Sequence, residues 1–177
     1  MLKTILIIAA VILVVLVAML AYAATKPNTY RVERSTRVKA TPAKIISLIK
    51  DFHEWARWSP YEKLDPDMTR TFSGSEQGPG AVYEWNGDGN VGQGRMEILE
   101  VTPDKVTIKL DFFRPMEGHN TAEFTLVPQG EETEVTWSMH GPSKFITKVM
   151  STYLNLDGMI GNQFAEGLNN LKTIAEK

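Results

Sequence analysis

The chain has 177 residues, of which 19 are basic and 21 acidic, so its formal net charge is −2, and it contains no cysteine. No block of five like charges occurs, whereas a nucleic-acid binder needs a concentrated cationic face, so we expect no nucleic-acid partner. Without cysteine there is no disulfide, thiolate metal site, iron–sulfur cluster or cysteine nucleophile. Outside an apolar N-terminal segment about 150 residues remain, enough for one domain with a single core.

The first predicted element is an unbroken run of 20 apolar residues from Ile5 to Ala24. A helix of that length rises about 30 Å, which matches the hydrocarbon core of a bilayer, and pairs its backbone polar groups internally. We therefore predict a transmembrane anchor over residues 1–25 and a separate domain over residues 26–177. A cleaved signal peptide is the alternative, because Ala21-Tyr22-Ala23 fits a small-x-small cleavage pattern, although the preceding apolar stretch is long for one.

The charges beside this segment give opposite indications of its orientation. Lys3 and the N-terminal amine favour a cytoplasmic N-terminus, which would place the domain outside. The five basic residues from Lys26 to Lys39 argue for the reverse by number, but some of them fall within a predicted strand. We expect a single-pass membrane protein with its domain on the periplasmic or outer face.

The domain begins with a strand and two short helices. Residues 30–38 alternate between polar and apolar and predict a strand. Thr41-Pro42 predicts a helix start, with Thr41 as N-cap and Pro42 at the first position, and an apolar face runs to Phe52. Residues 53–58 predict a further helical turn that ends before Pro60.

From about Met68 the apolar pattern has period two, which is typical of strands with one buried face. Turn residues such as Gly78-Pro79-Gly80 and Gln129-Gly130 separate the strands and favour antiparallel neighbours in a meander. The six predicted strands are residues 68–73, 81–86, 94–101, 105–113, 121–127 and 133–140.

The chain ends in a predicted helix over roughly residues 144–176. Its apolar stripe is formed by Ile160, Phe164, Leu168, Leu171 and Ile174. Three glycines within it, at positions 158, 161 and 167, indicate either a bend or a close approach to the sheet. A helix about 10 Å wide cannot cover the concave face of a curled seven-stranded antiparallel sheet, so the pattern predicts an α+β fold with a cavity between helix and sheet.

Several motifs resemble one family, the polyketide cyclase/dehydrase and lipid transport family of the SRPBCC or START-like superfamily. The resemblance covers about residues 30–175, in matching element order. It implies the helix-grip fold, and a role as lipid carrier, binder of a hydrophobic molecule, or cyclase. The motifs are Trp55-Ala-Arg-Trp58-Ser-Pro60, Gly78-Pro-Gly80-Ala-Val-Tyr83-Glu-Trp85, Gly92-Gln-Gly94, Thr133-Glu-Val-Thr-Trp137 and Phe164-Ala-Glu-Gly167-Leu168-Asn-Asn-Leu171-Lys172.

Aromatic side chains on the inward faces are the candidate ligand-binding residues, although they would fill a core equally well. Trp55 and Trp58 lie three apart on one side of a helical turn, as a lid over a pocket or, as we favour, as a core plug. Arg34 lies on the inward side of its strand and needs a partner, a ligand anion or access to water. The candidates are Trp58, Tyr83, Trp85, Phe112, Phe124, Trp137 and Phe164.

The sequence offers no candidate catalytic, metal or cofactor site. His53, His119 and His140 are widely spaced, and no G-x-S-x-G motif occurs. The G-x-G-x-x-G match at residues 87–92 joins two predicted strands, so we interpret it as a hairpin rather than a nucleotide loop.

Three functions remain open at this point. The first is a membrane-tethered domain that holds a hydrophobic small molecule or lipid between helix and sheet. The second is a cyclase or dehydratase that uses the same cavity, for which a buried acid–base pair would be the sign. The third is a ligand-free envelope interaction module, which a cavity smaller than about 300 Å³ would favour.

Overall fold

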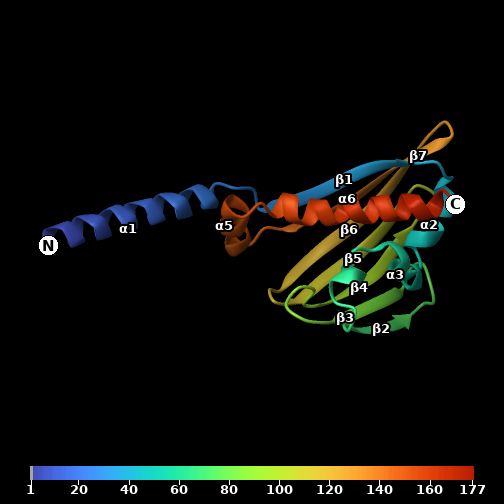
Figure 1. The fold of residues 1–177 in the computed structure, drawn as a ribbon, viewed down its shortest axis with the longest axis horizontal. Coiled ribbons are helices and arrows are strands. Elements are labelled where there is room, and N and C mark those ends of the chain that lie inside the picture. Colours follow the sequence, from blue (N-terminus) through green and yellow to red (C-terminus); the bar gives the residue numbers. More distant parts are fainter. Residues whose placement is uncertain (1) are drawn as a thin grey trace.

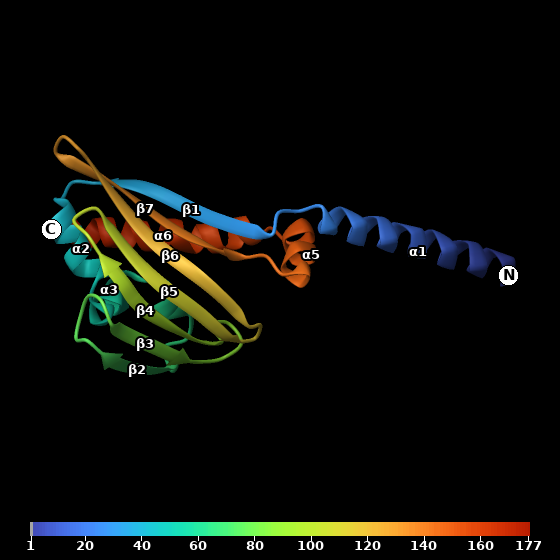
Figure 2. The ribbon, with the colours of Figure 1, turned by 180° about the vertical axis from the view of Figure 1, so that it is seen from behind.

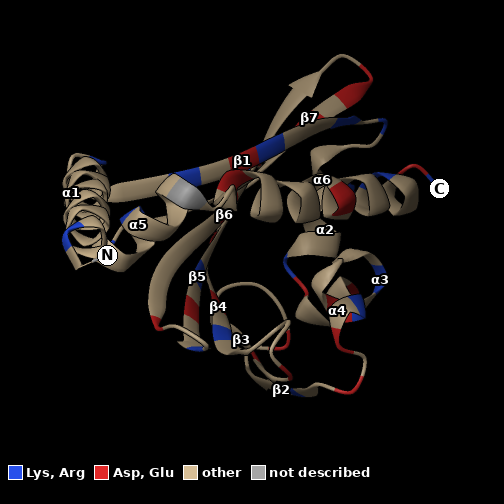
Figure 3. Cartoon of the chain, turned by 60° about the vertical axis from the view of Figure 1, so that its left-hand side comes forward, with Lys and Arg blue, Asp and Glu red and all other residues tan. Residues whose placement is uncertain are grey.

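The structure is a computed structural model that describes residues 2–177. Its first helix, α1 (Leu2–Ala24), extends away from the rest of the chain (Figure 1). It is long and apolar enough to cross a membrane, and the rest of the protein buries none of its most apolar stretch. Figure 3 shows no charged residue along α1 except near its ends. The division into residues 1–25 and 26–177 remains a prediction.

Seven strands form one antiparallel sheet, as the alternation predicted, and the sheet curls around the long helix (Figure 2). The order is β1-β7-β6-β5-β4-β3-β2, so a meander of six strands is extended at one edge by the first strand, which pairs with the last. The strands are β1 (Thr29–Val38), β2 (Thr69–Gly74), β3 (Ala81–Asn86), β4 (Gln93–Val101), β5 (Lys105–Arg114), β6 (Gly118–Gln129) and β7 (Glu132–Pro142).

Between β1 and β2 the chain forms four short helical segments. The predicted helix start is confirmed: the Thr41 hydroxyl accepts a hydrogen bond from the Lys44 amide, and Pro42 occupies the first turn. The segment after Pro60 is helical as well, which the sequence analysis did not predict. These segments are α2 (Pro42–Ile49), η1 (Phe52–Glu54), α3 (Trp55–Trp58) and α4 (Tyr61–Leu64).

The C-terminal helical region is divided into α5 (Phe145–Tyr153) and α6 (Leu156–Ala175), so the prediction of one continuous helix over residues 144–176 was wrong. The division has a local cause, because the Asn155 side chain accepts a hydrogen bond from the Gly158 amide and so caps α6. A Cβ at Gly158 would lie 2.4 Å from the Asn155 side chain, so glycine leaves room for this cap.

The other two helix glycines permit close contact between α6 and the sheet. A Cβ at Gly161 would lie 2.1 Å from the Arg34 guanidinium, and one at Gly167 would lie 2.7 Å from the Trp137 ring. Arg34 reaches across from β1 to the first turn of α6, where Asp157 accepts its hydrogen bond at 3.0 Å. This hydrogen bond lowers the pKa of Asp157 below its ordinary value. The sheet edge and the helix are thereby joined at the end of the domain nearest α1.

Candidate ligand-binding cavity

The first feature of the site is an aromatic plug beneath the sheet. Trp55 and Trp58 are buried, and their indole N–H groups donate to the carbonyl oxygens of Ile49 at 2.9 Å and Leu48 at 3.1 Å. The Trp58 ring contacts Phe124 and Trp137 with centroids 6.0 and 5.6 Å away. Trp58 therefore occupies the position that the core-plug interpretation requires, whereas Trp55 is buried and also lines the neighbouring cavity.

Beside this plug lies an interior cavity of about 290 Å³ between the sheet and α6. Five of the seven candidate residues line it, namely Tyr83, Trp85, Phe112, Trp137 and Phe164. The other two, Trp58 and Phe124, are fully buried and lie outside its lining. The rest of the wall consists of aliphatic or thioether side chains such as Met96, Leu110 and Ala122, of three further aromatic residues, and of three polar ones. These six residues are Tyr30, Trp55, Tyr61, Ser59, Glu62 and Asn90.

Glycine shapes one wall of the cavity. A Cβ at Gly94 would lie 2.4 Å from the Trp85 ring, so glycine in β4 allows the indole to lie across the strand. The Trp85 indole N–H donates to the Val91 carbonyl at 2.9 Å, which fixes the ring. The residues of the Gly87–Gly92 motif thus form the β3–β4 connection, as the hairpin interpretation predicted.

One charged group enters the apolar wall. The Tyr83 hydroxyl donates to the Glu62 carboxylate at 2.6 Å, and the Arg70 guanidinium donates to the same carboxylate at 2.7 Å. Burial, followed by the hydrogen bond to Glu62, raises the pKa of Tyr83 far above its ordinary value, so this phenol stays protonated. Neither Glu62 nor Arg70 was predicted as a site residue. Glu62 lies on α4, a helix that the sequence pattern did not predict, and without Glu62 nothing marked Arg70 on the predicted strand β2 as the partner of a carboxylate at the cavity wall.

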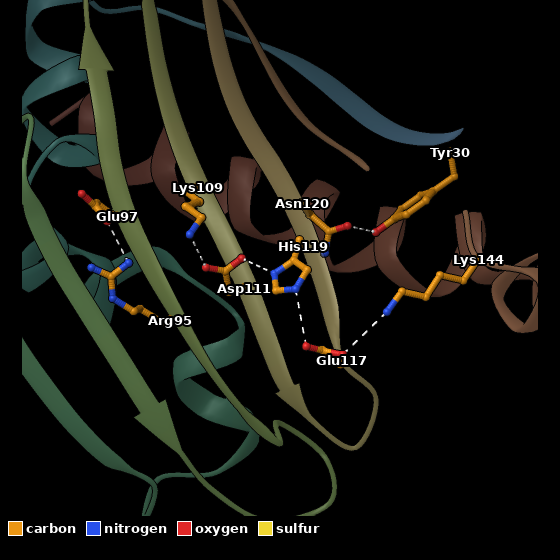
Figure 4. A network of polar contacts seen from close by, with 9 residues as sticks. All are labelled: Tyr30, Arg95, Glu97, Lys109, Asp111, Glu117, His119, Asn120 and Lys144. Atoms are coloured by element: carbon orange, nitrogen blue, oxygen red, sulfur yellow. Dashed lines mark hydrogen bonds and ion pairs between the residues drawn. The ribbon is translucent and has the colours of Figure 1, made fainter. Parts of the chain in front are cut away.

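A second polar contact lies at the end of the cavity nearest α1. The Tyr30 hydroxyl donates to the Asn120 side-chain oxygen at 2.7 Å (Figure 4). Asn120 is buried, and a Cβ at Gly141 would lie 2.2 Å from its side-chain oxygen, so Gly141 makes room for the amide. Tyr30 also lines the cavity, and burial raises the pKa of its hydroxyl.

Tyr30 lines a second space as well, a surface groove of about 480 Å³. The groove lies between the start of β1, the β5–β6 turn, α5 and the start of α6. Tyr30, Phe112 and Ile160 line both the groove and the interior cavity, so the two spaces adjoin at these side chains.

The convex side of the sheet carries an ionic network that ends near this groove (Figure 4). Asp111 lies 2.9 Å from the Lys109 ammonium and 2.8 Å from a His119 ring nitrogen. Burial of the Asp111 carboxyl raises its pKa. The hydrogen bonds from Lys109 and His119 together outweigh this effect, so the pKa of Asp111 lies below its ordinary value.

We expect Asp111→Asn to destabilise the fold at neutral pH by about 1–2 kcal/mol, because the buried carboxylate accepts hydrogen bonds from Lys109 and His119. The native pKa of Asp111 is depressed, so its contribution is complete above the unfolded pKa of about 3.9 and is lost as the pH falls through the native value. Urea unfolding at a series of pH values should therefore show the wild type and the variant converging in acid. Asp67→Asn, at an exposed carboxyl, is the control; a difference between wild type and Asp111→Asn that is independent of pH would contradict the prediction.

A curled antiparallel sheet gripped by a long C-terminal helix, with an apolar space between them, defines a helix-grip protein. A model of one family, described as polyketide cyclase / dehydrase and lipid transport, matches residues 29–176. The chain belongs to this family. A search of curated proteins found no match.

Solved structures of low identity share the fold. Protein CV1439 from Chromobacterium violaceum is 17% identical, with a TM-score of 0.58 over 85% of this chain and 99% of that one. The Aha1 dimer from Colwellia psychrerythraea is 16% identical, with a TM-score of 0.59 over 83% of this chain and 96% of that one. The di-domain ARO/CYC StfQ from the steffimycin biosynthetic pathway is 14% identical, with a TM-score of 0.64 over 84% of this chain and 51% of StfQ.

Proposed function

We propose that this protein is a membrane-tethered binding domain that holds a hydrophobic small molecule or lipid between α6 and the sheet. The observation that carries the proposal is the interior cavity, whose wall is mainly apolar and which adjoins a larger groove at the end of the domain nearest α1. An empty apolar cavity is costly, about 24 cal/mol per Å³ in one mutational series, so an apolar ligand would stabilise the fold.

The volume of the cavity requires a second candidate. At about 290 Å³ it lies just under the lower limit of about 300 Å³ for ligand pockets, which by itself favours a ligand-free interaction module. The groove bears on this comparison, since it adjoins the cavity at the side chains of Tyr30, Phe112 and Ile160, which line both spaces. With those side chains displaced, the joined space falls well inside the range of ligand pockets.

The polar cluster supports binding over catalysis. Tyr83 and Glu62 form the hydrogen-bonded phenol–carboxylate pair that an enzyme would need at the cavity. A general acid works best when its pKa lies near the operating pH, whereas the pKa of Tyr83 is raised far above neutrality. The cluster is better suited to joining α4 to β2 and β3 at the cavity wall than to transferring a proton.

Filling the cavity tests the proposal. Ala122 lies on the cavity wall at the centre of β6, and we expect Ala122→Leu to place its larger side chain in the space that the ligand would occupy. Native mass spectrometry of the purified full chain, with extraction of co-purifying lipids, should detect a bound apolar molecule in the wild type and at least tenfold less in the variant.

The matched control is Ala56→Leu, which adds the same side chain at an exposed position of α3 and should leave the bound molecule in place. Equal thermal midpoints of the two variants would show that Ala122→Leu is folded. A wild-type chain that carries no apolar molecule, and that takes up none in titration, would refute the binding function and favour the ligand-free module.

A further inference from the structure

The groove lies where the domain meets the helix suited to the membrane. It begins at Lys26 and Pro27, directly after α1 ends at Ala24. The Lys148 ammonium donates to the Asn28 side-chain oxygen at 2.7 Å, and the Ser143 amide donates to the Asn28 carbonyl at 2.7 Å. These bonds fix α5 to the linker that follows α1, and Figure 1 shows α5 near the end of that helix. The groove, which Lys26 and Pro27 line, therefore opens there.

Apolar side chains surround this opening and are not covered by the rest of the protein. Met116 and Leu154 in the groove wall are exposed, and Phe145 and Ile146, which stand in the chain between the lining residues Lys144 and Thr147 without lining the groove themselves, are 52% and 55% exposed. Exposed apolar side chains that gather in one place are characteristic of protein or membrane contacts. Their position next to the end of a helix with the length and hydropathy of a membrane span indicates that a bilayer covers them.

Charged side chains lie at the same opening. The groove is lined by Lys26, Arg31 and Lys144 together with Glu117 and Asp157. An apolar channel with charged groups at its outer end matches an amphiphile, whose chain leaves water while its polar group stays hydrated. Several of these charges also pair within the protein, Asp157 with Arg34 and Lys144 with Glu117, so the polar group of an amphiphile would lie among existing ion pairs.

Three side chains lie where groove and cavity adjoin, and one of them makes a polar contact. Tyr30, Phe112 and Ile160 come from three different elements, β1, β5 and α6, and each is only partly buried. The hydrogen bond from Tyr30 to Asn120 holds the tyrosine ring in this position. A side-chain rotation of Tyr30 would break only this one side-chain hydrogen bond, a small net cost compared with the motions of folded proteins.

We propose that a lipid of the bilayer that holds α1 enters the interior cavity through this groove, past Tyr30, and leaves its polar group among the charged residues at the opening. This inference rests on the proposed binding function and names the source of its ligand. The bilayer is thus both the anchor of the protein and the store of its ligand, and the bound lipid needs no passage through water.

Photolabelling of the full chain in vesicles tests the route. The vesicles contain phosphatidylcholine and phosphatidylglycerol, with a trace of phosphatidylcholine that carries a diazirine at the end of one acyl chain. After irradiation, peptide mass spectrometry should find label on α5 and also on cavity residues of β4 and β5, such as Met96 and Leu110. Tyr30→Phe, which keeps the ring and removes the hydroxyl, should raise the initial rate of cavity labelling several-fold.

Two double variants supply the comparison for the opening. Phe145→Ser with Ile146→Ser should lower cavity labelling several-fold. Leu99→Ser with Val127→Ser removes side chains that are similarly exposed, 50% and 53%, from strand positions that do not line the groove, and should leave cavity labelling unchanged. Thermal midpoints equal to that of the wild type would show that each double variant is folded.

The results of the photolabelling experiment distinguish the proposed entry route from the proposed binding function. Label confined to α1 and α5 would overturn the route. If the same lipid then labelled the cavity of the full chain in detergent solution, the binding function would stand without the route. Absence of cavity label in both vesicles and detergent would overturn both.

Discussion

Replacing Trp137 with alanine is expected to lower the free energy of unfolding by about 3–5 kcal/mol, the largest stability effect we expect of a single substitution in this chain. Its ring is stacked on Phe164 with centroids 4.2 Å apart and on Phe124 with centroids 5.0 Å apart. It also meets Trp55 and Trp58 edge to face. The substitution would therefore remove the contact between β7, α6 and the aromatic plug at once.

The measurement is urea unfolding of the full chain in a mild detergent, followed by the circular dichroism of the sheet. Trp137→Phe keeps a ring in the stack, and we expect it to cost only about 1–2 kcal/mol. Phe113→Ala, at an exposed position of β5, should change the free energy by no more than about 0.5 kcal/mol and serves as control. A loss below about 1 kcal/mol for Trp137→Ala would show that the core closes over the gap.

The same substitution bears on function, because Trp137 belongs both to the plug and to the cavity wall. Gly167 allows this double role, since a side chain there would strike the benzene edge of the indole. The stack is thus the boundary between two parts of the space between α6 and the sheet: the aromatic plug, which is filled by side chains, and the cavity, which is not. A stable core on one side of Trp137 is what allows an apolar cavity to persist on the other.

The sequence predicted the face of each aromatic residue correctly, but not its depth. Alternation along a strand determines which side of the sheet a residue occupies, so Tyr83, Trp85, Phe112 and Trp137 were expected to face inward together. Whether an inward residue meets a cavity or another side chain depends on the helices above it. Phe124 faces inward like Trp137, but the rings of Trp55 and Trp58 cover it.

Polar contacts between distant segments were less accessible to sequence reasoning. Tyr30 and Asn120 are 90 positions apart, and their contact depends on the pairing of β1 with β7, which the order of the strands in the chain does not reveal. Glu62 was missed for a local reason, because Pro60 was interpreted as the end of the helical region, whereas it precedes α4. The break before α6 could have been predicted from Asn155 followed by Gly158, which is a capping arrangement.

Replacing Glu62 with leucine is expected to be the second most damaging change, at about 2–3 kcal/mol, because it removes the shared partner of two groups. Arg70 would lose the carboxylate that balances its charge, and the Tyr83 hydroxyl would lose its acceptor at the cavity wall. Removing one partner of a buried ion pair leaves the other charge uncompensated, and the partial exposure of Arg70 keeps the loss below the usual range of about 3–5 kcal/mol.

A double-mutant cycle with Tyr83→Phe measures how strongly the two residues are coupled. If the hydroxyl–carboxylate hydrogen bond is as strong as its 2.6 Å length indicates, urea unfolding should give a coupling energy of about 1–2 kcal/mol. Glu76→Leu, at an exposed glutamate in the β2–β3 connection, is the control and should have little effect on stability. A coupling energy near zero would mean that Arg70 alone holds the carboxylate, and the cavity wall would then present Tyr83 as a free hydrogen-bond donor to the ligand.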